Sequence, residues 1–331
     1  MKNLIFAGAF ALMLGGIAHA APCCVACNPY LGRWALTLPG NGPGWLGVEK
    51  KGDQLKSSIL WYGGSVVPTA ETKFADGKLQ VIRKHGWTKD GKQVFNTETI
   101  TATIDGDQMK LSSRTVDPNG HEVRKSEFTG KRIPPVPARP DLAKIKYGKP
   151  IQMFQKDSLK GWTLMNTKAP NGWSMKDGVL SNRVKGPDGK NRHCTNIKTE
   201  QTFEDFNLKT DVRMMPGGNS GIYLRGIYEI QMSDSYGRRC DSHNMGALYS
   251  RITPLVAAEK PAKEWQHIDI TLVDRHVTVI LNGKTIIDNQ PVLGCTGGAL
   301  TSDEFKPGPL YLQGDHSDVD YRNMVLTPIV K

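Results

Sequence analysis

The chain has 331 residues, of which 38% are hydrophobic and 23% are charged, a composition that excludes a disordered protein. Its 35 glycines and 20 prolines follow no collagen-like period, so they predict many turns and a β-rich fold. The formal net charge is +11, but the basic residues form no basic helix and no RNA-binding signature, so we expect no nucleic-acid partner. We expect a solvated basic surface, with weak attraction to anionic envelope polymers as the alternative.

Residues 1–20 have the pattern of a signal peptide. Lys2 provides the positive start, a mostly apolar stretch follows from Leu4 to Ile17, and Ala18-His19-Ala20 is a small-x-small cleavage site. The apolar stretch is too short for a membrane anchor, and it is the longest in the chain. We therefore expect an exported protein, periplasmic or extracellular, with no integral membrane segment.

Six cysteines remain after residue 20, and an oxidising compartment would permit disulfide bonds between them. The cluster Cys23-Cys24-x-x-Cys27 lacks the second ligand pair that a zinc site needs, so it favours structural disulfides over metal or redox chemistry. The other three are Cys194, Cys240 and Cys295. With three cysteines in each half, either one bond crosses between the halves or each half keeps a free thiol.

Residues 21–132 predict a first β domain. Asp-Gly pairs at 76–77, 90–91 and 105–106 separate short alternating runs, which is a strong hairpin signal. Successive strands at this spacing predict an antiparallel meander or small barrel. Gly32-x-Trp34 resembles the start of lipocalin-like barrels, and this resemblance covers one strand only.

Residues 133–149 hold four prolines between Pro134 and Pro140, so they predict an exposed, stiff linker. The pattern after the linker remains β. Asp177-Gly178 and Asn282-Gly283 each lie between alternating runs and predict hairpins. Residues 150–331 therefore predict an antiparallel β-sandwich or jelly roll.

The most polar stretch of this second part predicts a hairpin with one functional face. Tyr223 and Arg225 share a face of the first strand, and Glu229 and Gln231 share a face of the second. A three-residue loop at 226–228 would pair Arg225 with Glu229 and Tyr223 with Gln231. The face is then either a solvated surface with a cross-strand ion pair or a groove that binds sugar hydroxyls.

A second polar stretch places Gln313, Asp315 and His316 at the end of another strand. A histidine beside carboxylates can act as a general acid or base, bind a metal, or be only a turn residue. A retaining glycosidase would need two carboxyl groups about 5–5.5 Å apart, but Glu229 and Asp234 should face opposite sides of a regular strand. The sequence therefore gives little support to a glycosidase of that kind.

Together these stretches resemble the 3-keto-disaccharide hydrolase domain. The resemblance covers roughly residues 150–331 and rests on motifs in their usual order, with Gln266 as a departure where the family commonly has Asn. The motifs are Phe154 with Leu159-x-Gly-Trp162, Trp173-x-x-x-Asp177-Gly178, Asn219-Ser-Gly-Ile-x-Leu-Arg225, Tyr228-Glu-x-Gln231-x-x-Asp234, Gly246-Ala-x-Tyr249, Glu264-Trp265, Leu281-Asn-Gly283, Leu312-Gln-Gly-Asp-His316 and Tyr321-Arg-Asn323.

The resemblance implies a concanavalin-like jelly roll that acts on glycosides already oxidised to a ketone at C3. The ketone acidifies the C2 proton, so a base can remove it, the C1 oxygen leaves by β-elimination, and water then adds. Glu229 or His316 would be the base, and Arg225 or a bound divalent cation would hold the enolate oxygen. The remaining candidates would bind the substrate: Asn219, Tyr223, Gln231, Asp234, Tyr249 and Gln313.

Two other interpretations stay open at this point. One is a non-catalytic carbohydrate-binding protein on the same jelly roll, and the other is a surface adhesion protein whose active part is the barrel. Convergence of Arg225, Glu229, Gln231 and His316 in one cleft would favour the enzyme. A shallow face without a buried titratable group would favour the binding protein.

Overall fold

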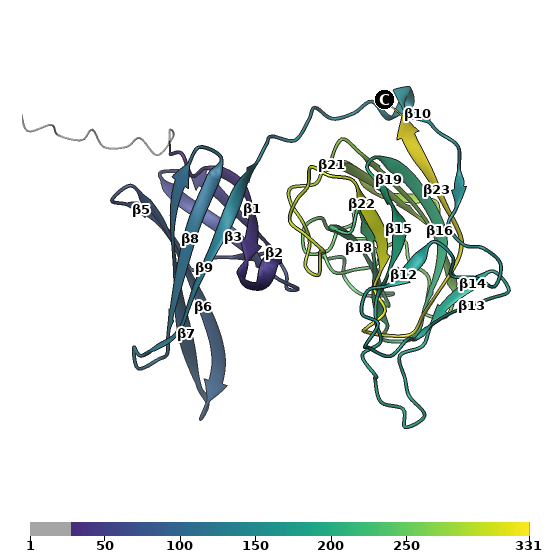
Figure 1. The fold of residues 1–331 in the computed structure, drawn as a ribbon, viewed down its shortest axis with the longest axis horizontal. Coiled ribbons are helices and arrows are strands. Elements are labelled where there is room, and N and C mark those ends of the chain that lie inside the picture. The colour runs from purple at the N-terminus through teal and green to yellow at the C-terminus, as the bar shows by residue number, and fades with distance from the viewer. Residues whose placement is uncertain (1–27, 331) are drawn as a thin grey trace, which may run out of the picture.

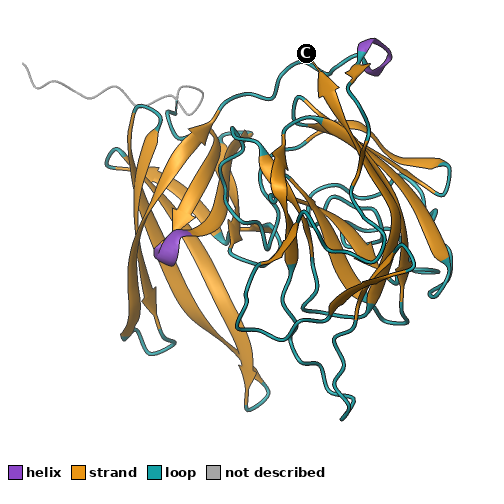
Figure 2. Ribbon diagram, turned by 45° about the vertical axis from the view of Figure 1, so that its right-hand side comes forward, coloured by secondary structure: helices purple, strands orange, loops and turns teal. Residues whose placement is uncertain are grey.

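The computed structural model describes residues 28–330, which form an all-β protein in two parts joined by a linker (Figure 1). The helices of these residues are two short 3-10 turns, η2 (Pro39–Asn41) and η3 (Leu142–Lys144) (Figure 2). No helix within the described range is long and apolar enough to cross a membrane. The predicted signal peptide and the cluster at Cys23, Cys24 and Cys27 lie outside the described residues.

The first part is one antiparallel sheet of nine strands in the order β4-β3-β2-β1-β9-β8-β7-β6-β5. Sequential strands pair from β1 to β4 and from β5 to β9, and β1 pairs with β9, so the predicted antiparallel meander is confirmed. A hydrogen bond between Ser57 and Thr72 (2.7 Å) links β3 to β5 as the sheet curls. The strands are β1 (Gly32–Leu38), β2 (Gly42–Lys51), β3 (Gln54–Trp61), β4 (Val67–Pro68), β5 (Glu71–Ala75), β6 (Lys78–Lys89), β7 (Lys92–Asp105), β8 (Gln108–Val116) and β9 (Glu122–Ile133).

Trp34 lies in the interior of this sheet and is fully buried. Its indole N–H donates to the Tyr30 carbonyl (3.0 Å), and the Arg132 guanidinium stacks on the ring at 4.1 Å from its centroid. The strand pattern places Trp34, Leu36 and Leu38 on one face, as expected for a period of two. Gly32-x-Trp34 therefore anchors the core of the first part.

The second part is a sandwich of two antiparallel sheets. One runs β13-β14-β23-β16-β19-β20-β21, with β10 and β11 paired to β23, and the other runs β12-β15-β22-β17-β18. The strands are β10 (Lys146–Tyr147), β11 (Ile151–Gln152), β12 (Trp162–Leu164), β13 (Trp173–Lys176), β14 (Val179–Asn182), β15 (Ile197–Phe203), β16 (Phe206–Met214), β17 (Asn219–Leu224), β18 (Tyr228–Ser233), β19 (Trp265–Val273), β20 (His276–Leu281), β21 (Lys284–Pro291), β22 (Gly308–Leu312) and β23 (Val319–Val330).

The core of the sandwich joins side chains from both sheets. Leu208 and Val212 of β16 and Ile222 and Ile230 of β17 and β18 are fully buried in one cluster. The predicted hairpins form at their expected places. At Asn282-Gly283, for example, φ is 49° and 81°, the left-handed pair that a type I′ turn requires.

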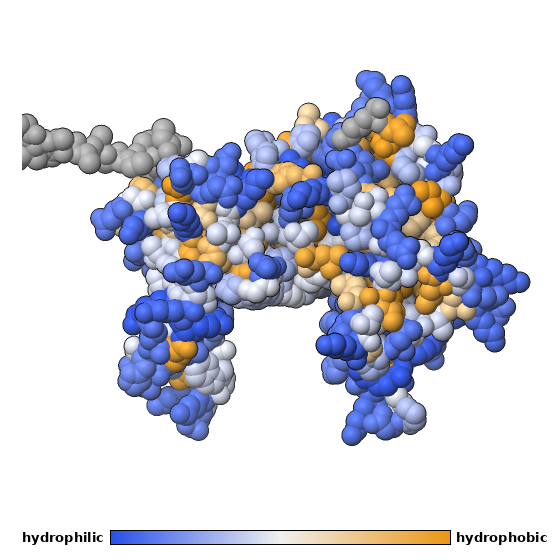
Figure 3. All heavy atoms as spheres, in the orientation of Figure 1, coloured by the Kyte–Doolittle hydropathy of each residue, from blue (hydrophilic) through white to orange (hydrophobic). Residues whose placement is uncertain are grey.

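The two parts share this core. Ala35, Trp45, Leu60 and Ile133 of the first part are buried in the same cluster as the sandwich. Figure 3 shows the two parts joined across their upper half and separated by an open notch below. The linker also docks, because Arg275 donates to the Pro135 carbonyl (2.6 Å). The two parts therefore form a packed interface, which positions the first part beside the site described below.

The predicted disulfides are not seen in the described residues. Cys194 and Cys295 are buried and free, and Cys240 is partly buried and free. These three thiols lie on different segments of the sandwich, and no disulfide joins them to one another.

Candidate active site

A pocket of about 480 Å³ lies on the five-stranded sheet where β17, β18 and β22 meet. Six of the nine predicted site residues line it, namely Asn219, Tyr223, Glu229, Tyr249, Gln313 and His316. The other three, Arg225, Gln231 and Asp234, do not. The volume lies within the range of small-molecule sites in proteins.

Strand register places the central residues in a row. Glu229 on β18 is directly opposite Tyr223 on β17, and Tyr223 is opposite Tyr311 on β22. The two tyrosine rings stack, with centroids 4.1 Å apart and an interplanar angle of 13°. Gly221 leaves room beside this row, because a Cβ there would overlap the Glu229 carboxyl. The carboxyl therefore lies over a position where only glycine fits.

Glu229 is the buried titratable group of this row. It is 3% exposed, and its backbone N–H donates to Thr296 Oγ1 (2.9 Å). Burial raises the pKa of the Glu229 carboxyl from 4.5 to about 8, and the nearby Asp315 charge raises it further, while the Tyr223 hydroxyl opposes the rise. A carboxyl of this kind stays protonated at neutral pH and becomes a comparatively strong base once it ionises.

A loop before β22 holds the row in place. The Tyr223 hydroxyl donates to the Gly297 carbonyl (2.8 Å). Gly298 adopts φ +78°, and a Cβ there would overlap the Tyr223 hydroxyl. The sequence reasoning missed this loop, for which the adjacent pair Gly297-Gly298 was the available signal.

The turn after β22 brings His316 to the same pocket. Ser317 connects the turn to β17, since its hydroxyl donates to the Asn219 carbonyl (2.7 Å). His316 Nδ1 lies 2.6 Å from an Asp315 carboxyl oxygen, and the side chain is 48% exposed. The hydrogen bond to Asp315 raises the pKa of His316, so its cationic form is favoured. Glu229 lies at the buried side of the pocket and His316 at its solvent side.

Two lining amides have free hydrogen-bonding capacity. Asn219 Oδ1 and Gln313 Oε1 are buried and have no partner in the protein. Buried polar atoms are normally paired, so these two are available to a polar ligand. Asn196, which sequence reasoning missed, donates to the Tyr311 hydroxyl (3.1 Å) and lines the same pocket.

The predicted pairing of Arg225 with Glu229 is wrong. Arg225 lies in the turn between β17 and β18 at φ 54°, and the loop spans 225–227. Its guanidinium donates to the carbonyls of Glu304 (2.8 Å) and Lys306 (2.6 Å), away from the pocket lining. Pairing is shifted by two residues along the strand, a change that keeps the side chains within both strands on their predicted faces and leaves Arg225 in the turn.

Gln231 and Asp234 do not reach the lining either. Gln231 lies opposite Gly221, so it is not opposite Tyr223 as predicted, although it shares the face of Glu229. Asp234 follows β18, and its carboxylate accepts the Gly217 N–H (2.9 Å) in the turn before β17. Asp234 therefore stabilises a turn at the pocket's edge.

The pocket does not present a metal-ligand set. Among residues 28–330, no group of three or more His, Cys, Asp or Glu side chains is placed to hold a metal ion. Glu229, Asp315 and His316 all line the pocket without gathering around one point. The divalent cation that the resemblance allows does not fit these residues as they stand.

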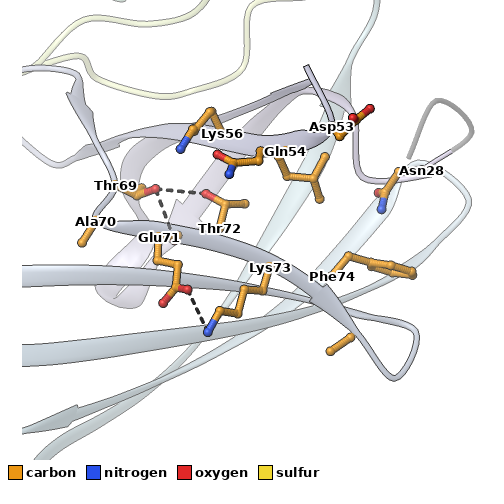
Figure 4. Close-up of a pocket in the computed structure, with 12 residues that line it drawn as sticks. Asn28, Asp53, Gln54, Lys56, Thr69, Ala70, Glu71, Thr72, Lys73 and Phe74 are labelled. Atoms are coloured by element: carbon orange, nitrogen blue, oxygen red, sulfur yellow. Dashed lines mark hydrogen bonds and ion pairs between the residues drawn. The ribbon is translucent and has the colours of Figure 1, made fainter. Parts of the chain in front are cut away.

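A second pocket of about 600 Å³ lies in the first part between β3 and β5 (Figure 4). Its charged residues are exposed, and Glu71 and Lys73 pair with each other at 2.8 Å. Thr69 and Thr72 also bond to each other (3.2 Å). With no buried titratable group in its lining, this pocket has none of the chemistry found beside Glu229.

Comparison with known proteins gives one family assignment. The solved structures to which this chain is similar include two candidate glycosyl hydrolases from Parabacteroides distasonis. One is 25% identical and covers 59% of this chain and 92% of its own (TM-score 0.43), and the other is 20% identical and covers 55% and 94% (TM-score 0.43). The carbohydrate-binding module CBM66 from Bacillus subtilis is 14% identical and covers 50% and 93% (TM-score 0.32). With TM-scores below 0.5, these similarities carry no weight for fold or function.

No curated protein sequence matches the chain. No family profile identifies the N-terminal part, for which the structure shows a nine-stranded antiparallel sheet. The profile of one family matches residues 149–327, more than half of the chain. Through these residues the chain belongs to the family of 3-keto-alpha-glucoside-1,2-lyase-like domains.

Proposed function

We propose that this protein cleaves glycosidic bonds in 3-keto-glycosides by β-elimination, with Glu229 as the base. The family supports the substrate class, and the pocket supports the chemistry. The observation that carries the proposal is the buried Glu229 carboxyl in a pocket that also contains His316.

The reaction follows from the acidity of the C2 proton beside a C3 ketone. Glu229 takes this proton, the electron pair forms the C1–C2 double bond, and the C1–O bond breaks. The leaving oxygen takes a proton and departs as an alcohol. Addition of water, with hydroxyl to C1 and a proton to C2, then gives the free 3-keto sugar.

His316 supplies the proton to the leaving oxygen in this scheme. The hydrogen bond to Asp315 raises the pKa of His316 and so favours its protonated form, which suits it better to act as an acid than as a base. Its position at the solvent side also suits the departing group. This arrangement assigns the two catalytic candidates to different roles.

Uncharged groups hold the substrate. Asn219 and Gln313 offer buried amide oxygens without protein partners, and Tyr249 offers a hydroxyl. The amide oxygens can accept hydrogen bonds from sugar hydroxyls, and the Tyr249 hydroxyl can donate to the C3 oxygen. Arg225 cannot fill the latter role while it binds the carbonyls of Glu304 and Lys306. Export to the periplasm or the medium remains part of the proposal, on the pattern of residues 1–20.

Release of p-nitrophenol tests the proposal. Both anomers of p-nitrophenyl 3-keto-glucoside are compared with the same glucosides unoxidised, and reactions without enzyme correct for spontaneous elimination. We expect release from a keto form only. Release from unoxidised glucosides at a similar rate would indicate an ordinary glycosidase. Binding of the keto sugar without release would indicate the non-catalytic carbohydrate-binding protein.

A further inference from the structure

The candidate active site is not built by the sandwich alone. Gly63, in the turn between β3 and β4 of the N-terminal sheet, lines the same pocket as Glu229 and Tyr249. We call residues 62–66 the interdomain loop. Residues more than 160 positions apart in the sequence thus form neighbouring parts of one pocket wall.

Hydrogen bonds fix the interdomain loop to the sandwich. The Val66 N–H donates to Ser250 Oγ (2.7 Å), and Ser65 Oγ lies 3.0 Å from His243 Nε2. The His243 ring in turn meets the Tyr249 ring edge-on, with centroids 4.9 Å apart. The loop therefore contacts the neighbours of Tyr249 as well as the pocket itself.

Backbone packing also joins the loop to the segment that positions Tyr223. Gly297 lies against the backbone of Gly63 and Gly64, and any Cβ at Gly297 would overlap the Gly64 carbonyl oxygen. The Gly297 carbonyl is the acceptor of the Tyr223 hydroxyl. Close backbone approach is a recognised reason for glycine at such a position.

A buried interface behind the loop keeps it in place. Trp45 is 7% exposed, and the Arg251 guanidinium stacks on its ring at 4.5 Å from the centroid. The Arg251 Nε also donates to the Cys295 carbonyl (2.8 Å), two residues before Gly297. The Ser302 hydroxyl donates to the Leu36 carbonyl of β1 (2.8 Å). The pocket wall at Gly63 is therefore held against the sandwich by a buried interface.

We propose that the N-terminal part of the chain is a specificity element: through Gly63 it forms a wall of the active-site pocket and limits the size of the group that a 3-keto-glycoside carries at C1. The inference rests on the proposed function. The keto ring must place its C2–H at Glu229, so the remaining pocket space is left for the C1 substituent. The absent side chain of Gly63 then provides part of that space.

Gly63 can be tested by adding a side chain. Its φ is not in the left-handed region, and a Cβ there meets no atom within 4 Å. Gly64 is a matched control, because its φ is also ordinary, its nearest contact is the Trp61 carbonyl at 3.9 Å, and it does not line the pocket. A Cβ therefore fits at either position, but only at Gly63 does it lie on the pocket lining, so we expect Gly63→Leu and not Gly64→Leu to fill pocket space.

The experiment measures kcat/KM of the full-length wild type, Gly63→Leu, Gly63→Ala and Gly64→Leu on three 3-keto-glucosides. Their C1 groups increase in size from methyl to p-nitrophenyl to the second glucose of 3-keto-trehalose. We expect Gly63→Leu to lose roughly 10- to 200-fold on the largest and far less on the methyl glycoside. Gly63→Ala should lose less, and Gly64→Leu should match the wild type.

The outcomes distinguish a failure of this inference from a failure of the proposed function. Equal losses on all three substrates, no loss at all, or the same pattern in Gly64→Leu would overturn the inference while leaving the proposed function in place. A wild type inactive on every keto glycoside would overturn the proposed function and this inference with it. Circular dichroism and thermal unfolding of each variant verify that the fold is retained.

Discussion

Replacing Glu229 by glutamine should separate its chemical role from its structural cost. Burial raises the pKa of the Glu229 carboxyl from 4.5 to about 8. Between these pH values the unfolded chain releases the proton while the folded protein keeps it. The folded state therefore binds more protons, and stability falls as pH rises through this window.

The size of the effect follows from the two pKa values. Stability falls by 1.36 kcal/mol for each pH unit that lies between the unfolded pKa of 4.5 and the folded pKa of about 8. From pH 5 to pH 9 the wild type should therefore lose about 4 kcal/mol of unfolding free energy through this group. Glu229→Gln keeps the shape of the side chain but cannot ionise, so it lacks this loss. Relative to the wild type, the variant should gain stability as pH rises.

Urea denaturation followed by tryptophan fluorescence at pH 5, 7 and 9 measures both proteins. The difference in unfolding free energy should change by several kcal/mol in favour of Glu229→Gln. Turnover of the variant should nevertheless fall by roughly 10²- to 10⁴-fold. In the wild type, kcat/KM on p-nitrophenyl 3-keto-glucoside, whose leaving oxygen needs no proton, should rise with pH through an apparent pKa near 8. Parallel stability curves for the two proteins would refute the buried, protonated carboxyl on which this reasoning depends.

Three further changes test other parts of the account. His316→Gln should slow alkyl 3-keto-glucosides by roughly 10²-fold or more but hardly affect p-nitrophenyl ones, whose leaving oxygen needs no proton; equal losses on both would argue against its role as acid. Arg225→Gln should lower the free energy of unfolding by roughly 2 kcal/mol, because the contacts with two carbonyls are lost, and kcat of the folded enzyme should be nearly unchanged. A fall in kcat without a loss of stability would show that Arg225 does act in the active site. Proteolysis within the exposed residues 134–140 should leave two fragments that co-elute in gel filtration, because Trp45 and Leu60 share the core of the sandwich, whereas separate elution would contradict that packing.

The sequence was sufficient for the strands and most turns. Alternation with a period of two and the Asp-Gly and Asn-Gly pairs are local signals, so they fixed the meander and the hairpins. The polar face of β17 and β18 followed from the same alternation. The match of residues 149–327 to the family agrees with the motifs that suggested it.

Register and loop placement could not be obtained in this way. A shift of two residues leaves every side chain on its face, so alternation could not show that Tyr223, and not Arg225, faces Glu229. Arg225 is held by carbonyls 79 and 81 residues away in the chain, which no local pattern reports. Gly63 reaches the pocket only through the packing of the two parts, so nothing in its own sequence marks it as a site residue.

The most direct test of the central claim follows the fate of the C2 hydrogen. Methyl 3-keto-glucoside carrying deuterium at C2 is incubated with the enzyme in ordinary water, and the released 3-keto-glucose is analysed by mass spectrometry at early times. A labelled product incubated alone corrects for spontaneous exchange. Removal of the C2 hydrogen by Glu229 predicts product without deuterium from the wild type and neither release nor exchange from Glu229→Gln. Product that retains deuterium at C2 would show that the C1–O bond breaks without C2 deprotonation, and would contradict the account.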